Sequence, residues 1–327
     1  MFESIFKDEL TTYFAGYYNM AYYTRLHVRE VLISFDKWLI ENKLTDKCIS
    51  KEIVDGWLKK ISANISNSSI YEKAVIINKF LTSLKILGYD VNLAYLIDYK
   101  NARNKYTPYI FTDEEIKSIL AYIDNLPTHR SYNKPVLPIA YKYSGLIIRI
   151  LAYCGTRLNE TLSIRINDII LAEGIITIKN AKKNKERFVI LHPKLNQMIK
   201  RHIQFLKLSN NDYLFPGINI NSHISKGPIK KVFSNALLAV GIHKNTRDDH
   251  SRGPCLHCLR HYFVLKAFKQ GVANGISVES QIPYLSYYLG HSSLNETEKY
   301  MKFSSELFPE EMEKFDDYSM DIFPEDI

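Results

Sequence analysis

The stretch Cys154-Gly155-Thr156-Arg157-Leu158-Asn159-Glu160 interrupts a long apolar run near residues 136–153. Gly155 is a helix breaker, and the polar residues that follow it are typical of the start of another helix. The sequence therefore predicts a long apolar helix, a break, and a short helix from Arg157. A guanidinium at a helix start points out of the core, and its planar charged fork suits two oxygens of one phosphate. The alternative is an ordinary surface arginine.

The segments around this break predict a mostly helical domain with one β-hairpin. Thr112-x-x-Glu115 is a capping box that starts a helix. Alternating apolar residues at Ile175–Lys179 and Arg187–Leu191 are typical of two half-buried strands joined by a turn. Helical periodicity follows near residues 195–207, 226–240, 257–270, 279–289 and 293–302. The predicted fold class is α+β, mostly α with a small β-hairpin or sheet.

Residues 1–100 predict a separate and almost wholly helical unit. Apolar residues at helical spacing cover 19–43, and Ser50 is placed to cap a helix through Ile61. Ser69-x-x-Glu72 indicates a capping box for a helix at 70–87, which Gly88 ends. Lysines and tyrosines interleave on the polar faces, as in a module that clamps DNA. Lysines on solvated helix faces explain the same pattern without DNA.

The charge of the chain divides into a basic body and an acidic tail. The 327 residues include 43 Lys+Arg and 35 Asp+Glu, for a net charge of +8. Residues 304–327 hold nine acids and one base, so the rest of the chain carries +16. This pattern favours a nucleic-acid binder whose tail docks on protein or screens the basic surface. A frayed, solvated terminus is the alternative.

Boundaries follow from composition. The basic and polar stretch 101–111 lacks apolar periodicity and predicts a linker. We therefore expect domains at 1–100 and 112–303, followed by the tail at 304–327. The N-terminus has no signal sequence, and charged residues interrupt the most apolar stretch, which predicts neither export nor a membrane span.

Four cysteines in a chain of this length suit a reducing cytosol and predict a cytoplasmic protein without disulfides. Cys255-x-x-Cys258 has the spacing of zinc ligands, and His250 and His261 are near enough in sequence to complete a site. Because a second pair of thiols is missing, we interpret both cysteines as small residues beside the functional site. We predict no metal and no cofactor.

Two further segments concentrate basic groups at turns or helix starts. The first is His257-Cys258-Leu259-Arg260-His261, which follows the helix breakers Gly253 and Pro254. The second is Leu289-Gly290-His291, in which Gly290 ends one helix, while Tyr300 lies on the next. Each of these residues taken singly is more often a loop or packing residue. Nearby, Tyr284, Tyr287 and Tyr288 are spaced as core residues of a helix rather than as base-stacking platforms.

Two arginines, histidines and a tyrosine without clustered carboxylates suit attack on a phosphodiester. The pentacoordinate phosphorane has extra negative charge, which fixed guanidinium groups neutralise. Clustered carboxylates would indicate metal ions instead. A tyrosine hydroxyl attacks with the help of a base, and the resulting phosphodiester conserves the energy of the broken bond. Such a reaction needs no ATP.

The ordered set of these motifs resembles the catalytic segments of the tyrosine recombinase, or phage integrase, family. It consists of Arg157 in Gly-Thr-Arg-Leu-Asn-Glu, His257-x-x-Arg260-His261, and Leu-Gly-His291 with Tyr300 nine residues later. The resemblance covers about residues 107–303, and the helical unit before it is similar to the family's core-binding domain. Each motif alone is weak, but their order and spacing together are specific.

The resemblance implies a role for each matched residue. Arg157 and Arg260 would hold the non-bridging oxygens of the scissile phosphate, with Glu160 orienting Arg157. The family also places a general acid on the hairpin, and Lys182 is the lysine that fits, rather than Lys183 or Lys185 at the same turn. The remaining assignments are His257 as base or hydrogen-bond donor, His291 as a phosphate contact, Tyr300 as the nucleophile that forms a 3′-phosphotyrosine, and His261 as a support of the fold.

By the same resemblance the chain is a site-specific DNA recombinase, an integrase for a mobile element. Four protomers on two double-stranded DNA sites would exchange strands through a Holliday junction, and the acidic tail would pack on a neighbouring protomer. A topoisomerase or telomere resolvase with the same chemistry is one alternative. A DNA-binding regulator on the same scaffold, without cleavage, is another.

Overall fold

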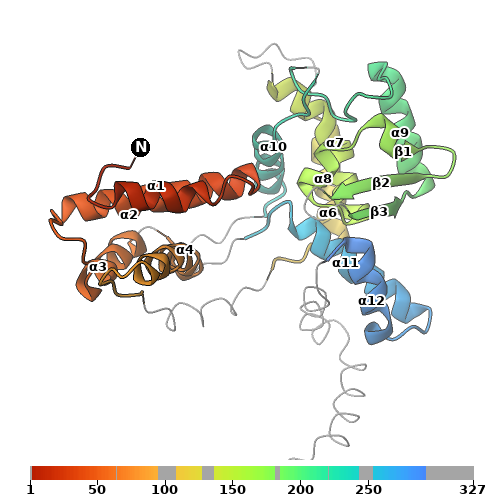
Figure 1. Cartoon of the computed structure of the whole chain (residues 1–327). Helices are drawn as coiled ribbons and strands as arrows, with labels where there is room; N and C mark the ends of the chain where they lie inside the picture. The colour runs from red at the N-terminus through yellow and green to blue at the C-terminus, as the bar shows by residue number, and fades with distance from the viewer. Residues whose placement is uncertain are drawn as a thin grey trace, which may run out of the picture. The chain divides into compact units, whose positions relative to one another are not determined.

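The computed structural model describes residues 2–63, 65–94, 108–126, 136–180, 185–219, 221–242 and 253–291 (Figure 1). The chain divides into two compact units, Met1–Thr107 and Pro108–Ile327. The described residues are mostly helical and include a small three-stranded sheet, which confirms the predicted fold class. No helix in these ranges is long and apolar enough to cross a membrane.

Helices pack around one apolar core in the N-terminal unit. Phe35 and Trp57 are fully buried there, and their rings meet edge to face with centroids 5.3 Å apart. Asp36 is also buried, and its carboxylate accepts hydrogen bonds from the backbone N–H groups of Glu3 and Ser4 at 2.8 and 3.1 Å. The helices are α1 (Lys7–Ala15), α2 (Tyr22–Glu41), α3 (Lys51–Ser62) and α4 (Asn67–Ile86).

The predicted capping box at Ser69 is wrong. Helix α4 begins three residues earlier, and Ser66 is its N-cap, with Oγ accepting a hydrogen bond from the Ser69 backbone N–H at 3.3 Å. Three serines and an asparagine between 66 and 69 all have good capping side chains, so the sequence does not distinguish among them. The end of the helix before Gly88, which has φ of +88°, agrees with the prediction.

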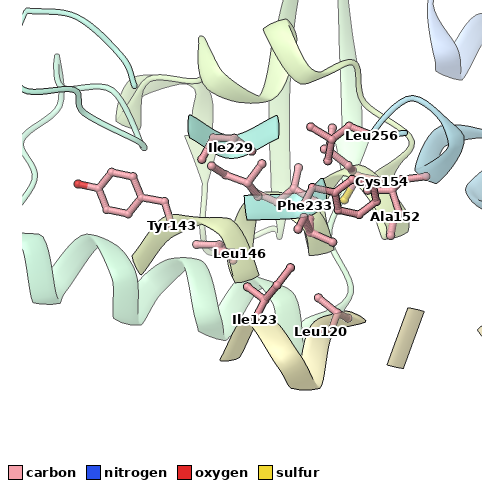
Figure 2. Close-up of a cluster of buried hydrophobic side chains, with 14 of the residues drawn as sticks. Leu120, Ile123, Tyr143, Leu146, Ala152, Cys154, Ile229, Phe233 and Leu256 are labelled. Carbon is pink, nitrogen blue, oxygen red and sulfur yellow. The ribbon is translucent and has the colours of Figure 1, made fainter. Parts of the chain in front are cut away.

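The long apolar helix α7 (Val136–Cys154) is the centre of the second unit. It contacts α6 (Asp113–Asp124), α8 (Leu158–Leu162), α9 (Pro193–Leu206), α10 (Lys226–Ala239) and α11 (Cys258–Ala273). Figure 2 shows its Leu146, Ala152 and Cys154 among side chains from α6 and α10. A helix surrounded on most sides is expected to be apolar on most faces, as this sequence is. The predicted capping box of Thr112 and Glu115 is present at the start of α6.

A three-stranded antiparallel sheet lies beside these helices. It contains β1 (Ile169–Ile170), β2 (Ile175–Asn180) and β3 (Lys185–Ile190) in that order, with β1 preceded by a 3₁₀ turn at Ile166–Asp168. The hairpin was predicted and β1 was not, because two residues are too few to show a period. On β3 the side chains alternate, so Arg187 and Val189 are buried while Phe188 and Ile190 are exposed. Arg187 faces the interior in the same alternation as the aliphatic residues.

Helix α12 (Val278–Leu289) packs on α11 through a small separate apolar cluster. Tyr288 stacks on Phe263 of α11, with ring centroids 5.5 Å apart. The prediction that Tyr284 and Tyr287 belong to the core is wrong, because each is 79% exposed. The buried face of α12 is instead defined by aliphatic residues such as Ile282 and Leu289, which leaves these two tyrosines on the outer face.

Candidate active site

Arg260 connects all three segments that the sequence singled out. It is the third residue of α11 and only 1% exposed. Its Nη1 donates a hydrogen bond to the carbonyl oxygen of Gly155 at 2.8 Å, and its Nη2 donates one to the carbonyl oxygen of Leu289 at 2.8 Å. The guanidinium of Arg260 therefore holds the segment of Gly155 and the segment of Leu289 together, although these two segments lie far apart in the sequence.

Gly155 turns the chain from α7 into α8 with φ of +62°. A Cβ atom added there would lie 2.4 Å from Cδ1 of Phe263, which is far inside van der Waals contact. The backbone conformation and the close approach of the ring both require glycine. The helix break predicted at this residue therefore also places its carbonyl on Arg260.

We expect Gly155→Ala to lower the free energy of unfolding by about 2 to 4 kcal/mol. The left-handed backbone costs an L-residue about 1–2 kcal/mol, and overlap with Phe263, which stacks on Tyr288, adds a similar amount. Urea unfolding followed by circular dichroism measures the difference. Gly227→Ala is the control, because a Cβ on that helical glycine meets nothing within 4 Å. Equal stability of the two variants would contradict the argument.

Arg157 lies at the N-cap of α8 and makes the contact with Glu160 that was predicted. The Glu160 Oε2 atom accepts a hydrogen bond from the Arg157 backbone N–H at 2.8 Å, and Oε1 accepts one from Nη1 at 3.0 Å. The Arg157 side chain is 35% exposed and that of Glu160 only 11%. A largely buried carboxylate thus holds both the backbone N–H and one guanidinium nitrogen of Arg157.

A second arginine, which the sequence analysis missed, holds the other side of the same carboxylate. Arg187 Nη2 lies 2.7 Å from Glu160 Oε2, and Nη1 lies 3.3 Å from Oε1. Burial raises the pKa of Glu160, but the hydrogen bond and charge of Arg187, together with Arg157, outweigh it and leave the pKa below its usual value. The sequence did contain a sign of this role. The alternation of β3 places Arg187 in the same inward-facing set as Val189, and a charged residue in such a position indicates a buried partner.

The three histidines of the motifs lie in one neighbourhood. His257 is exposed at the start of α11, and its ring centroid is 5.0 Å from that of His261. His291 follows Gly290, which ends α12 with φ of +65°, and its backbone N–H donates a hydrogen bond to the carbonyl oxygen of Ser286 at 3.0 Å. Burial lowers the pKa of His261 to about 3, and the charges of His257, Arg260 and His291 act in the same direction. His261 is therefore neutral near pH 7.

Stability is expected to depend on pH through His261. Its pKa is near 6.5 in the unfolded chain and about 3 when folded, so the unfolded chain binds more protons between these values. The contribution is present above pH 6.5 and declines as the pH falls toward 3, with a loss of about 3 kcal/mol by pH 4. Urea unfolding at several pH values should show a weaker acid dependence for His261→Gln than for the wild type. Parallel curves would exclude this source.

A pocket of about 350 Å³ adjoins the site. Thr156 and Leu158, on either side of Arg157, contribute to its wall, as does the predicted His257. Lys230 and Ser234 of α10 add a cation and a hydroxyl that the sequence analysis did not assign to the site. Phe233, Pro254, Cys255 and Leu256 complete the lining. Basic and hydroxyl side chains therefore share this pocket with apolar ones.

Cys255 and Cys258 are both free thiols, with their Sγ atoms 3.6 Å apart. Burial and the neighbouring thiol raise the pKa of Cys258, with the hydrogen bond to Cys255 as the largest cause. His250, the other candidate ligand, lies outside the described residues. Within the described ranges, no group of three or more histidine, cysteine, aspartate or glutamate side chains is arranged to hold a metal ion.

Four of the six predicted site residues are therefore in the described part of the chain, and the contacts of Arg260 and His261 bring their segments together. These are Arg157, His257, Arg260 and His291. Lys182 and Tyr300 lie outside the described residues, as do the predicted helix at 293–302 and the tail at 304–327. The roles of all six residues stay predictions.

Comparison with known proteins identifies the family. A tyrosine recombinase of Pseudothermotoga lettingae is 25% identical over 268 residues, which cover 81% of this chain and 82% of the relative. A putative integrase/recombinase of Sinorhizobium fredii is 27% identical over 210 residues, 63% of this chain and 64% of that protein. The crystal structure of the XerH site-specific recombinase, bound to its palindromic difH substrate in a post-cleavage complex, has the same fold. Its TM-score is 0.66 at 18% identity, over 95% of this chain and 83% of that one.

The second unit of the chain matches a family profile over most of its length. Residues 110–306, more than half of the chain, match the profile of the phage integrase family. This range contains the segments of Arg157, Arg260 and His291 together with Tyr300, and it confirms the resemblance that those segments indicated. The chain belongs to the phage integrase family.

Proposed function

We propose that this chain is a tyrosine-type site-specific recombinase that cuts and rejoins DNA through a 3′-phosphotyrosine at Tyr300. The observation that carries the proposal is the pair of hydrogen bonds from Arg260 to the carbonyls of Gly155 and Leu289. These bonds gather the cationic segments of the second unit around one place, as attack on a single phosphorus atom requires.

Each residue then has a defined part in strand cleavage. Arg157 and Arg260 neutralise the non-bridging oxygens, and His291 contacts the same phosphate. The Tyr300 hydroxyl loses its proton with the help of His257 and forms the new O–P bond. The bond from phosphorus to the 5′ oxygen breaks, and Lys182 supplies the proton to that oxygen. Attack by a 5′ hydroxyl reverses these steps and rejoins the strand.

The assembly in this proposal is a tetramer on two DNA sites. The helical domain at 1–100 and the catalytic domain at 112–303 hold the DNA, and the tail at 304–327 packs on the next protomer. Strands are exchanged in pairs through a Holliday junction, in service of a mobile element. The free cysteines fit action in a reducing compartment such as the cytoplasm. The names of the relatives favour recombination over relaxation of DNA or regulation without cleavage.

A nicked suicide duplex tests the proposal. The protein is incubated with duplexes from the ends of its element, nicked next to the cleavage position so that a short fragment diffuses away after cleavage. We expect an adduct that survives a denaturing gel and forms equally in EDTA, with peptide mapping that places the nucleotide on Tyr300. An adduct on another residue would refute the assignment, and cleavage that requires a metal ion would refute the mechanism.

A further inference from the structure

Arg187 lies on β3, five residues after Lys182, and none of the roles above uses it. Its side chain is 6% exposed, and it contacts Glu160 through two nitrogen–oxygen pairs. Two parallel bonds to a carboxylate fix the orientation of both groups, which a single ammonium would not do. The strand that leaves the hairpin turn is thereby joined to the residue that holds Arg157.

The other side of Arg187 meets the third motif. A Cβ atom on Gly290 would lie 3.2 Å from Arg187 Nη1 and 3.3 Å from its Cδ atom. Gly290 ends α12 and directly precedes His291. Burial raises the pKa of Tyr288, and the charge of Arg187 acts against that increase, so the guanidinium is also near this residue of α12. Arg187 thus lies between the first motif and the third.

Arg187 lowers the pKa of the Glu160 carboxyl more than Arg157 does. Among the groups that lower the pKa of Glu160, the hydrogen bond and charge of Arg187 come before the backbone and charge of Arg157. A buried carboxylate without a partner would be costly or would take up a proton. Arg187 therefore keeps Glu160 ionised, and the ionised Glu160 holds Arg157.

A contribution to folding stability does not by itself explain why an arginine occupies position 187. Its Nε is buried and has no hydrogen-bond partner among the described residues. Buried charges with incomplete hydrogen bonding are often no more stable than apolar side chains of similar volume. Neighbouring Val189 has an aliphatic side chain in the equivalent inward position of the same strand. A charged group at position 187 thus points to a purpose other than packing.

We propose that Arg187 is a positioning residue for strand cleavage, one that acts through Glu160 on Arg157. The proposal rests on the proposed function, because Arg157 is taken to face the scissile phosphate. Arg187 sets the place of the Glu160 carboxylate, and the two bonds from Glu160 to Arg157 fix the start of that side chain. Lys182 precedes β3 by a few residues in the sequence. The contact between Arg187 and Glu160 therefore also connects the strand that follows the proposed general acid to the residue that holds Arg157.

The first test is single-turnover adduct formation by Arg187→Lys on the suicide duplex. We expect a rate about 10- to 100-fold below wild type, the usual effect of removing a residue that orients a functional group, with DNA affinity within about twofold. Arg149→Lys is the matched control, because Arg149 forms a similar two-bond pair with Asp124, at 2.9 and 2.6 Å, away from the motifs. Its cleavage rate should stay within about threefold of wild type.

A double-mutant cycle separates positioning from general damage. If Arg187 acts through Arg157, then adding Arg187→Lys to Arg157→Lys should lower the cleavage rate by less than about threefold. If Arg187→Lys instead damages the fold elsewhere, its full effect on the rate should multiply that of Arg157→Lys. Should Arg187→Lys fail to fold, Glu160→Gln takes its place in the same cycle, because it removes the charge that Arg187 holds and keeps the shape. Wild-type cleavage by Arg187→Lys, or a full additional loss in the double variant, would overturn the inference. Absence of an adduct in the wild type would instead refute the proposed function.

Discussion

Replacing Tyr300 by phenylalanine is expected to abolish the covalent adduct between the protein and DNA. The substitution removes only the phenolic oxygen, which is the atom that forms the bond to phosphorus in the proposed mechanism. Loss of a nucleophile costs several orders of magnitude in rate, so the adduct should fall at least about 10³-fold, to the background of the gel. Binding to the same duplex, measured by gel shift, should stay within about twofold because the phosphate contacts are unchanged.

The chain offers matched controls for this result. Tyr284 and Tyr287 are each 79% exposed on α12, and the same substitution there removes a phenolic oxygen from the surface of that helix. Tyr284→Phe and Tyr287→Phe should form the adduct at the wild-type rate. Adduct formation by Tyr300→Phe would contradict the assignment of the nucleophile. Loss of the adduct in either control would show that the aromatic face of α12 also takes part.

Arg260→Ala should cause the largest loss of stability among substitutions at the site, about 3 to 6 kcal/mol. Two buried carbonyl oxygens, those of Gly155 and Leu289, lose a charged donor, and each unpaired group costs about 1–3 kcal/mol. The cavity left by the side chain adds to this cost. Urea unfolding of the wild type and the variant measures the difference. The adduct should disappear as well, because Arg260 no longer holds the segments of Arg157 and His291 and, in the proposed mechanism, no longer neutralises the phosphate.

Lys266→Ala controls for removal of a cation from the same helix. Lys266 pairs with Asp113 at 2.7 Å, but their side chains are 50% and 42% exposed, so the loss should be below about 1 kcal/mol. Arg260→Lys should lie between the two, because one ammonium group does not replace a fork that reaches two carbonyls. Equal stability of Arg260→Ala and Lys266→Ala would show that the carbonyl contacts contribute little.

Local features of the fold were predictable where the signal is local. The break at Gly155, the capping box of Thr112 and Glu115, and the presence of the hairpin each depend on a few neighbouring residues, although β3 begins at Lys185, two residues before its predicted start. The contact partners of Arg260 were not predictable in this way. Sequence spacing places it beside His257 on a helix, whereas its hydrogen bonds reach residues 105 and 29 positions away. Only the family resemblance indicated that these segments meet.

The wrong predictions have physical reasons. At the start of α4, Ser66, Ser68 and Ser69 are all good capping residues, and capping preference alone does not resolve the three-residue difference between Ser66 and Ser69. In α12, tyrosine is amphipathic, so helical spacing alone does not tell whether the ring or an aliphatic neighbour takes the buried face. Arg187 was overlooked because charged residues near a hairpin tip are usually solvated, and its buried partner Glu160 lies on a different element.

Arg260 is needed for folding as well as for the proposed catalysis, and this affects how the sequences of diverged relatives are interpreted. A descendant that abandons cleavage still has to satisfy the carbonyls of residues 155 and 289, so selection for folding alone would preserve arginine at position 260. Its survival therefore says little about whether a homologue is still an active enzyme. Position 300, where the proposed mechanism needs a hydroxyl, is the informative one to inspect.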